Sequence, residues 1–304
     1  MRVAVVPIPS TRPDGALFDS RNLPALLDVA RLAEDLGVDD LAMSEHVVMA
    51  HRPEKYGPSS APHHFDEPWP EPLTTLAAMA AVTRRVRVIS TIVIAPLRPA
   101  VLLAKTAATV HALSGGRFVM GVSTSWHEEE YAALGVPFAE RGSRLDDTIG
   151  ACRALWGGTP ASFSSPSIQF QDLICVPRPD RADDIPIWFG AAFTPRMVRR
   201  VVQHGHGWMP FVGPEPRPME MMANGVAALR LAMEHAGRDP STLEVSALLL
   251  ARGRDLPTAI DQDLPAFQTA GVNHLRVQAS MFVSSLDEIP RFLEDLLRRL
   301  EPYR

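Results

Sequence analysis

Cysteine, lysine and long apolar runs are scarce in this chain of 304 residues, and each scarcity excludes a class of protein. The two cysteines, Cys152 and Cys175, cannot make a disulfide framework and fit no metal-binding spacing, so we expect a reducing cytoplasm and no bound metal. No apolar run approaches the roughly 20 residues of a membrane helix. The opening MRVAVVPIPS is too short and too soon interrupted by proline for a signal peptide, so we expect no membrane association.

An excess of basic residues is missing as well. The 30 lysines and arginines are outnumbered by 35 aspartates and glutamates, which leaves a net charge of -5. Because a nucleic-acid-binding protein needs a basic face, we expect no nucleic-acid partner. Hydrophobic residues make up 46% of the chain, which is ordinary for a globular protein with a sizeable core and excludes a disordered chain.

Short β-branched runs alternate along the chain with stretches whose apolar residues recur every three or four positions. The second pattern is typical of a helix with one buried face, as in Leu103, Ala107 and Val110. The expected strands are Val3–Val6, Asp40–Ser44, Val86–Val93, Phe118–Val122, Ile187–Phe189, Gly207–Met209, Glu244–Leu250 and His274–Gln278. Eight strands that alternate with helices predict a single (β/α)8 TIM barrel over residues 1–304, with an open doubly wound sheet as the alternative.

Three stretches are too long for simple connections in such a barrel. Val47–Pro70 and Trp126–Arg144 follow the second and fourth expected strands, so they would cover the mouth where barrel active sites lie. We expect the first to form a wall of the substrate pocket. In the second, we expect Glu128–Glu130 to be the solvated start of a short helix. Pro160–Pro186 has an alternating centre that predicts a hairpin before the fifth strand.

Polar residues gather where the expected strands end. His46 follows the second strand directly, and histidine can exchange a proton near neutral pH. The fourth strand ends in three hydroxyl residues and an indole, namely Ser123, Thr124, Ser125 and Trp126. The fifth strand ends in Gly190, Ala191 and Ala192, after which Thr194 and Pro195 begin a helix. Backbone N–H groups at such a helix start suit a phosphate, although an ordinary capped helix explains the pattern equally well. No GxGxxG or P-loop motif is present.

Taken together, these motifs carry a family resemblance. Three segments resemble the bacterial luciferase-like superfamily, namely LAEDLGVDDLAMSEHVV, EPLTTLAAMAAVTRRVRVISTIVIAPLRPAVLLAKTAATVHALSGGRFVMGVSTSWHEEEYAALGVPFAERGSRLDD and IPIWFGAAFTPRMVRRVVQHGHGWMP. Within it they look most like the coenzyme F420-dependent oxidoreductases that are common in actinobacteria. The resemblance runs from Val3 to about Pro210, and it implies a barrel with a flavin or 5-deazaflavin across its mouth. It also implies a homodimer, because dimers are frequent in this family.

The resemblance assigns roles to particular residues. It places His46 beside the reactive ring as a proton donor or acceptor, and it implies a non-proline cis peptide near Thr91-Ile92 that backs the ring. The family's Gly-x-Gly after the fourth strand is Ser123-Thr124-Ser125 here, with both glycines replaced. Sugar-phosphate-oxidising members have a carboxylate where this chain has Trp126, so that activity is not expected.

The later motifs depart from the family pattern. The usual Gly-Gly after the fifth strand is Ala191-Ala192, with one residue inserted around Phe193, which weakens the phosphate site. The familiar Gly-Asp-Gly-Trp is Gly205-His206-Gly207-Trp208, a change that the sequence leaves unexplained. Nothing in the sequence selects among four arginines near the mouth for contact with an anionic cofactor tail; they are Arg12, Arg52, Arg98 and Arg141.

From the resemblance we predict an F420-dependent oxidoreductase that transfers a hydride between the deazaflavin and a small organic substrate. His46 would be catalytic. The predicted cofactor-binding residues are Thr91, Ile92, Ser123, Thr124, Ser125, Trp126, Gly190, Ala191, Ala192, Phe193 and Thr194. The first alternative is an FMN-dependent luciferase-like monooxygenase, in which reduced flavin captures oxygen. The second is a barrel without cofactor that serves as a binding or structural subunit, because the glycines of both cofactor loops have changed.

Overall fold

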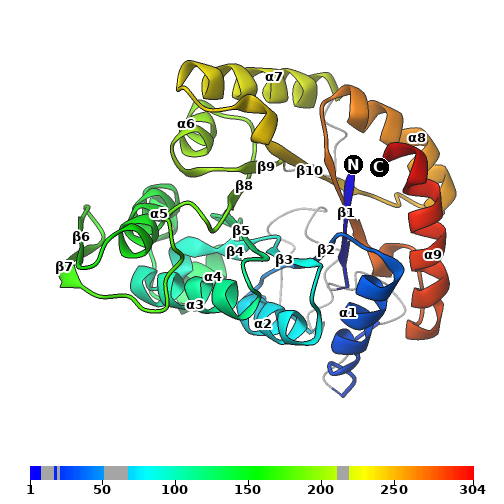
Figure 1. Ribbon diagram of the computed structural model, residues 1–304, viewed down its shortest axis with the longest axis horizontal. Coiled ribbons are helices and arrows are strands. Elements are labelled where there is room, and N and C mark those ends of the chain that lie inside the picture. Colours follow the sequence, from blue (N-terminus) through cyan, green and yellow to red (C-terminus); the bar gives the residue numbers. More distant parts are fainter. Residues whose placement is uncertain (8–16, 19–20, 51–67, 211–218) are drawn as a thin grey trace.

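The computed structural model describes residues 1–7, 17–18, 21–50, 68–210 and 219–304, and it shows parallel strands enclosed by helices (Figure 1). The strands are β1 Arg2–Val6, β2 Asp40–Met43, β3 Arg87–Ser90, β4 Val93–Ile94, β5 Phe118–Ser123, β8 Ile187–Ala191, β9 Gly207–Pro210, β10 Glu244–Leu249 and β11 His274–Gln278. Neighbouring strands pair in the order β3-β2-β1-β11-β10-β9-β8-β5-β4, and β3 also pairs with β5. That last pairing closes the sheet, so the predicted barrel of eight strands is confirmed and the open doubly wound sheet is excluded.

The third strand of the barrel is interrupted, which the sequence did not predict. The sequence predicts a continuous strand over Val86–Val93, but the structure has two short strands, β3 and β4, on either side of Thr91-Ile92. The peptide bond between Thr91 and Ile92 is cis, as the family resemblance implies. Both halves pair with β5, so they form one interrupted barrel strand.

The helices surround this barrel. They are α1 Ala25–Leu36, α2 Pro72–Val82, α3 Ala100–Leu113, α4 Glu128–Ala133, α5 Arg141–Gly157, α6 Pro195–His204, α7 Met219–His235, α8 Leu256–Thr269 and α9 Ile289–Leu300. Local chemistry sets several helix starts. Proline, which lacks an N–H, begins α2 and α6, and the side chains of Glu71 and Thr194 accept hydrogen bonds from free N–H groups of the first turn. Among the described residues, none of the helices combines the length and apolar character needed to span a bilayer.

Along most barrel strands, alternate residues belong to different apolar clusters. Val3 and Val5 pack with the helices in the main core, whereas Ala4 and Val6 belong to a second, smaller cluster. The two faces of a strand alternate, so the second cluster lies inside the barrel. The same division holds on the neighbouring strands, where the inward residues include Ala42, Ile89, Val119, Trp188 and Met209. The barrel interior is therefore packed, and the cavity lies above this packing.

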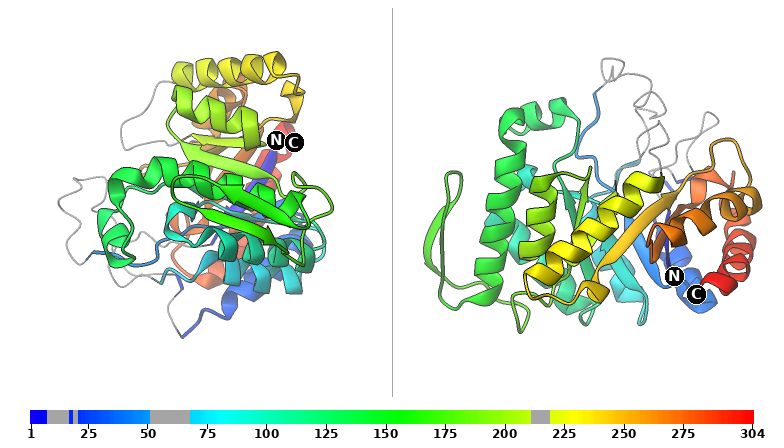
Figure 2. Two further views of the ribbon diagram at one scale, coloured as in Figure 1. Left: turned by 90° about the vertical axis from the view of Figure 1, so that its left-hand side faces the viewer. Right: turned by 90° about the horizontal axis from the view of Figure 1, so that it is seen from above.

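The predicted hairpin is confirmed. Strands β6 Ala161–Ser164 and β7 Gln169–Leu173 pair antiparallel between α5 and β8. The hairpin lies outside the barrel beyond α5 (Figure 2). Phe163 of the hairpin packs so closely on Gly150 of α5 that a Cβ there would lie 2.9 Å from its ring. Of the predicted lid over Val47–Pro70, residues 51–67 lie outside the described part of the chain.

Candidate active site

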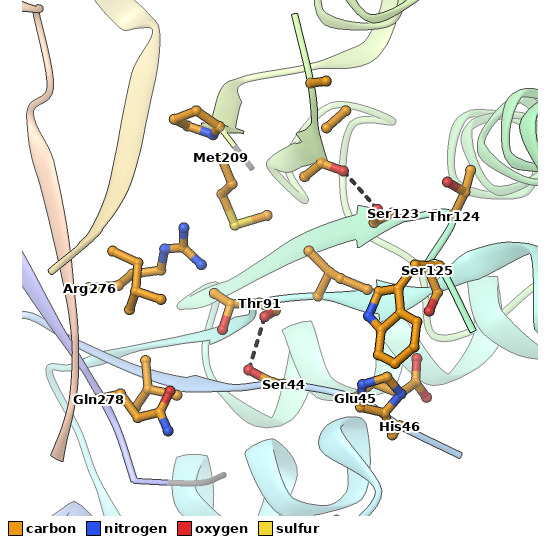
Figure 3. A pocket seen from close by; sticks show the side chains of 18 of the residues that line it. Ser44, Glu45, His46, Thr91, Ser123, Thr124, Ser125, Met209, Arg276 and Gln278 are labelled. Carbon is orange, nitrogen blue, oxygen red and sulfur yellow. Dashed lines mark hydrogen bonds between the residues drawn. The ribbon is translucent and has the colours of Figure 1, made fainter. Parts of the chain in front are cut away.

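A cavity of about 520 Å³ lies at the carboxyl ends of the barrel strands (Figure 3). It is lined by Val6, Ser44, Glu45, His46, Trp69, Thr91, Ile92, Ser123, Thr124, Ser125, Trp126, Gly190, Ala191, Ala192, Met209, Pro210, Leu248, Arg276 and Gln278. All the predicted site residues except Phe193 and Thr194 are in this set. The cavity lining thus brings together residues from Val6 near one end of the chain to Gln278 near the other.

Phe193 and Thr194 lie at the start of α6. The Phe193 ring packs against Trp208 with 5.9 Å between ring centroids, and the Thr194 hydroxyl oxygen accepts a hydrogen bond from the Met197 N–H. These contacts show what the two residues do within the protein. Their contact with a cofactor stays a prediction.

Glu130 is the partner of His46, and the sequence reading of this residue is wrong. Glu128 is exposed, as expected of a solvated helix start, but Glu130 is completely buried. One carboxylate oxygen, Oε2, lies 3.2 Å from His46 Nδ1, and the other accepts a hydrogen bond of 2.7 Å from the Val47 N–H. A carboxylate at Nδ1 orients the imidazole and favours the tautomer with its proton on Nδ1.

Aromatic rings surround the imidazole of His46. Its centroid lies 4.7 Å from that of Trp69, 5.6 Å from Trp126 and 5.9 Å from His127, and the rings meet edge to face. Trp69 belongs to the described end of the predicted lid, so part of that segment does form a wall of the cavity. The His46 side chain is only 8% exposed. It is therefore shielded from bulk water but lies at the cavity surface.

Glu45 lines the same cavity as His46 but has different partners. Its carboxylate accepts hydrogen bonds from the Ile94 N–H and from Arg98. Burial raises the pKa of Glu45, against the lowering effect of the Arg98 charge. Because Arg98 also pairs with Glu71 at 2.6 Å, it is already held by two carboxylates. Glu45 and Arg98 fix the exit from the interrupted third strand.

The interrupted strand presents Thr91 and Ile92 to the cavity. The Ser44 hydroxyl donates to the Thr91 carbonyl at 3.0 Å, whereas the buried Oγ1 of Thr91 has no hydrogen-bond partner among the described residues. Ile92 reaches across to Gly190, where an added Cβ would lie 2.9 Å from Ile92 Cγ2. Gly190 is therefore required by the close approach of the Ile92 side chain.

The hydroxyl residues after β5 are used largely by the protein itself. Ser123 donates to the Gly190 carbonyl at 2.7 Å, and the Tyr131 hydroxyl donates to the carbonyl of Thr124. Ser125 has a φ of 57°, in the left-handed region that glycine favours, and it stands where the family has a glycine. Its hydroxyl lies 3.4 Å from Glu130 Oε2. Serine thus keeps the glycine conformation and adds a contact to the His46–Glu130 pair.

Arg276 is a cavity residue that the sequence reasoning missed. It lies on β11, and its Nε donates to the Ser246 hydroxyl oxygen at 3.0 Å. Figure 3 shows its guanidinium on the opposite side of the cavity from His46 and Ser125. A signal was available, because His274, Arg276 and Gln278 are polar residues at alternate positions of a barrel strand. Such a period places all three on one face of the strand.

The remaining predicted residues are placed as follows. Among the arginines proposed for an anionic tail, the Arg141 guanidinium lies over the Phe138 ring at 3.9 Å. Arg12 and Arg52 lie outside the described residues. No group of three or more potential metal ligands occurs within the described part of the chain.

Comparison with known proteins gives this architecture its family. The profile of the family described as "Luciferase-like monooxygenase" matches residues 5–295. The chain belongs to this family. An uncharacterized protein of Mycobacterium tuberculosis, Rv0940c, is 30% identical over 228 residues, which cover 74% of this chain and 76% of that protein. The phthiodiolone/phenolphthiodiolone dimycocerosates ketoreductase of Mycobacterium bovis is 30% identical and covers 61% of this chain and 49% of its own.

Solved structures agree on the fold of this luciferase-like protein. The monooxygenase RslO1 from Streptomyces bottropensis superposes with a TM-score of 0.80 at 22% identity, covering 100% of this chain and 99% of its own. An F420-dependent secondary alcohol dehydrogenase, solved with an F420-acetone adduct, superposes with a TM-score of 0.75 at 16% identity, covering 99% of both chains. Proteins described as a monooxygenase and as an F420-dependent dehydrogenase thus share this fold.

Proposed function

We propose that this protein is an F420-dependent oxidoreductase that acts on a small organic substrate. The observation that carries the proposal is that His46, oriented by Glu130, lines one cavity with Thr91 and Ile92, the residues between β3 and β4. When bound there, F420 would give or accept a hydride, and it lacks the ring nitrogen that lets reduced flavin react with oxygen. The M. bovis ketoreductase supports a reaction of this kind.

The residues of the cavity fit a planar ring. Its volume of about 520 Å³ lies in the range of small-molecule sites. The buried Thr91 hydroxyl lacks a partner in the described structure, and a polar ring edge is the kind of group that would supply one. We propose that Thr91 and Ile92 back the ring and that Ser123, Thr124, Ser125 and Trp126 flank it. The segment Gly190–Thr194 would lie toward the tail.

His46 would move the proton that accompanies the hydride. Transfer of a hydride to a carbonyl carbon leaves charge on the oxygen, which a nearby proton donor neutralises. With Nδ1 directed at Glu130, the other ring nitrogen, Nε2, is the one that exchanges the proton with the substrate oxygen. The Glu130 carboxylate orients the imidazole, and the surrounding tryptophans Trp69 and Trp126 exclude water from the exchange.

Two other functions follow from the same site. An FMN-dependent monooxygenase would use the same cavity, and RslO1 supports this alternative because it is described as a monooxygenase. A barrel without cofactor is the third possibility, supported by Ser125, Ala191 and Ala192 at glycine positions of the family.

Titration of the purified protein with F420, reduced F420 and FMN separates the three. The cavity tryptophans provide a fluorescence signal, and we expect F420 to bind much more tightly than FMN. Saturation by FMN at lower concentration than F420 would support the monooxygenase instead. If none of the three binds, the cofactor-free barrel is the correct function.

We also propose that the protein acts in the cytoplasm as a homodimer. Leu102 on α3 is 60% exposed, and Ile174 and Val176, which follow β7, are 67% and 63% exposed. The Val176 carbonyl accepts a hydrogen bond from Lys105, so this segment runs against α3. A second copy of the chain would cover this apolar surface. Light scattering should give twice the mass of the chain, and Ile174→Glu should shift it toward the monomer; a monomeric wild-type protein would contradict the proposal.

A further inference from the structure

The cavity has a cationic side chain with no carboxylate partner. Glu45 is engaged by Arg98 and Glu130 by His46, and no carboxylate of the described residues pairs with Arg276. The arginine is partly buried and opens toward the cavity. Burial lowers the pKa of Arg276 to about 10, so the guanidinium still carries its charge at neutral pH. A buried charge without a partner is costly, which makes this position a candidate for binding an anion.

A chain of hydrogen bonds inside the barrel holds Arg276 in place. Ser246 accepts from Arg276 Nε at 3.0 Å, the Ser246 hydroxyl lies 2.7 Å from His274 Nδ1, and His274 Nε2 lies 3.0 Å from Asp40 Oδ2. Asp40, Ser246 and His274 are completely buried. Asp40 is in turn bound by Arg2 and Arg87 at the opposite end of the barrel.

The donors and acceptors of this chain fix its direction. Arginine can only donate and a carboxylate can only accept, so Ser246 accepts from Nε, and His274 carries a proton on Nε2 that it donates to Asp40. In a neutral ring Nδ1 is then an acceptor, so the Ser246 hydroxyl donates to it. The lowered pKa of His274, caused by burial, agrees with this neutral form. Ser246 also accepts from Nη2 through its carbonyl at 3.3 Å, so the guanidinium is held along one edge.

Nη1 of Arg276 is left without an acceptor among the described residues. The guanidinium is planar and rigid, and its geometry matches a carboxylate. Because its Nε edge is already fixed, binding an anion at the other edge would cost little side-chain entropy. The buried chain thus preorganises an anion-binding group at the cavity wall.

Arg276 lies far from the side of the barrel where the ring is expected. In the closed order of strands, β11 is separated from β5 by three strands on either side, so the two lie opposite each other. Ser123 ends β5 and Thr91-Ile92 interrupts the strand next to it, whereas Arg276 faces them across the cavity. An anion at Arg276 is therefore better placed as part of the substrate than of the ring.

We propose that Arg276 recognises a carboxylate of the substrate, so that the substrate class is small organic carboxylates. This inference rests on the proposed function in placing the reacting carbon between Arg276 and His46. The carboxylate anchors one end of the molecule at β11, and the group that reacts points toward His46. Ser246 and His274 are positioning residues, because they act through the orientation of Arg276.

Benzoate and benzamide are matched probes for this site, since they differ mainly in charge. Binding is followed by the fluorescence of Trp69 and Trp126, in the protein alone and in the protein saturated with F420. We expect benzoate to bind about 10- to 100-fold more tightly than benzamide, the range of a charge-assisted hydrogen bond. Arg276→Gln should bring the ratio to about one, and Arg276→Lys should keep part of it.

Two further variants separate recognition from general damage. Leu248 on β10 is the register partner of Arg276 on β11, and Leu248→Ala removes volume there without changing the charge. The affinities for benzoate and benzamide should therefore change by the same factor, and their ratio should persist. Ser246→Ala removes the Nε acceptor and should lower the ratio while leaving F420 affinity unchanged.

The proposal is overturned if wild-type protein binds the two probes equally, or if Arg276→Gln keeps the ratio. It is also overturned if Arg276→Gln weakens F420 binding and the preference for benzoate over benzamide is seen only in the absence of F420. Arg276 would then bind the cofactor ring. Failure of wild-type protein to bind F420 would count against the proposed function alone, since the benzoate ratio is measured separately.

Discussion

The carboxylate of Glu130 lies 3.2 Å from Nδ1 of His46, although 84 positions separate the two residues in the chain. The contact exists because β2 and β5 end at the same rim of the barrel, and α4 directs Glu130 back toward the end of β2. This contact fixes the orientation of the imidazole ring at the cavity surface. We therefore expect a substitution of His46 to lower turnover more than a substitution of Glu130 does.

His46→Ala should lower turnover by about 10²- to 10⁴-fold, because a positioned proton donor contributes that much. Glu130→Gln should have a smaller effect in the same direction, since the ring keeps a hydrogen-bond partner but loses the negatively charged carboxylate beside Nδ1. Glu128→Gln is the matched control, because Glu128 is exposed two residues earlier on the same helix. Steady-state kinetics with F420 and cofactor titrations check all three. Normal turnover by His46→Ala would show that the ring only packs against its neighbours.

The sequence predicts the barrel correctly because its signals are local. Apolar spacing and proline positions define each strand and helix, and the strands β1, β2, β10 and β11 begin or end within a residue or two of the expected positions. The break in the third strand has no such local signal, and it was expected only from the family resemblance. The spacing of apolar residues does not report a change of backbone conformation inside a strand.

The two site residues that were missed depend on contacts between distant segments. Glu130 lies on a helix of six residues, which is too short for a face to be read from spacing. Arg276 is held through His274 to Asp40, a contact over 234 positions. The predicted barrel places β11 opposite β5, and the alternation of polar residues puts Arg276 on one face of β11. A single sequence carries no information on the hydrogen bonds that hold these polar side chains.

Ser125→Gly should raise the free energy of unfolding by up to about 1 kcal/mol. A residue with a side chain at a φ of 57° has a steric penalty that glycine avoids, partly offset by the greater freedom of glycine in the unfolded chain. The long contact from Ser125 to Glu130 contributes little to stability. Chemical denaturation measures the change. As a control, Ser143→Gly lies in the right-handed backbone of α5 and should lower the free energy of unfolding instead. Destabilisation by Ser125→Gly would mean that the hydroxyl contact outweighs the backbone effect.

Lowering the pH below about 6.5 should destabilise the protein through His206. Burial, with the charges of Arg153 and Arg238 nearby, lowers the pKa of His206 to about 4, and its Nδ1 accepts a hydrogen bond from the Ile187 N–H. Between pH 4 and 6.5 the unfolded chain binds this proton and the folded protein does not, so stability falls as the pH falls, by up to about 3 kcal/mol.

His206→Asn tests this origin, because an asparagine oxygen can accept the same hydrogen bond and does not titrate. The free energy of unfolding of the variant should fall less than that of wild type between pH 7 and pH 4.5. The difference between the two proteins at pH 8, where His206 is neutral in both the folded and the unfolded state, gives the effect of the substitution itself. The contact also gives His206 a structural role at the position where the family resemblance implies an aspartate. Parallel curves for the two proteins would assign the acid sensitivity to other groups.

Gly190 and Ile92 should be energetically coupled. A methyl group at Gly190 would lie 2.9 Å from Ile92 Cγ2, so Gly190→Ala must displace the Ile92 side chain and should cost about 1–3 kcal/mol of stability. Removing the obstacle with Ile92→Ala creates a cavity and is destabilising alone, but the double variant should be more stable than the sum of the single effects predicts. Denaturation of the four proteins gives the coupling free energy directly.

Because Ile92 is proposed to back the ring, Gly190→Ala should also weaken F420 binding. Gly150 lies equally close to Phe163 in the hairpin, so Gly150→Ala should affect stability alone. Additive effects within the cycle would show that Ile92 moves aside without cost, and the need for glycine at position 190 would then have another cause.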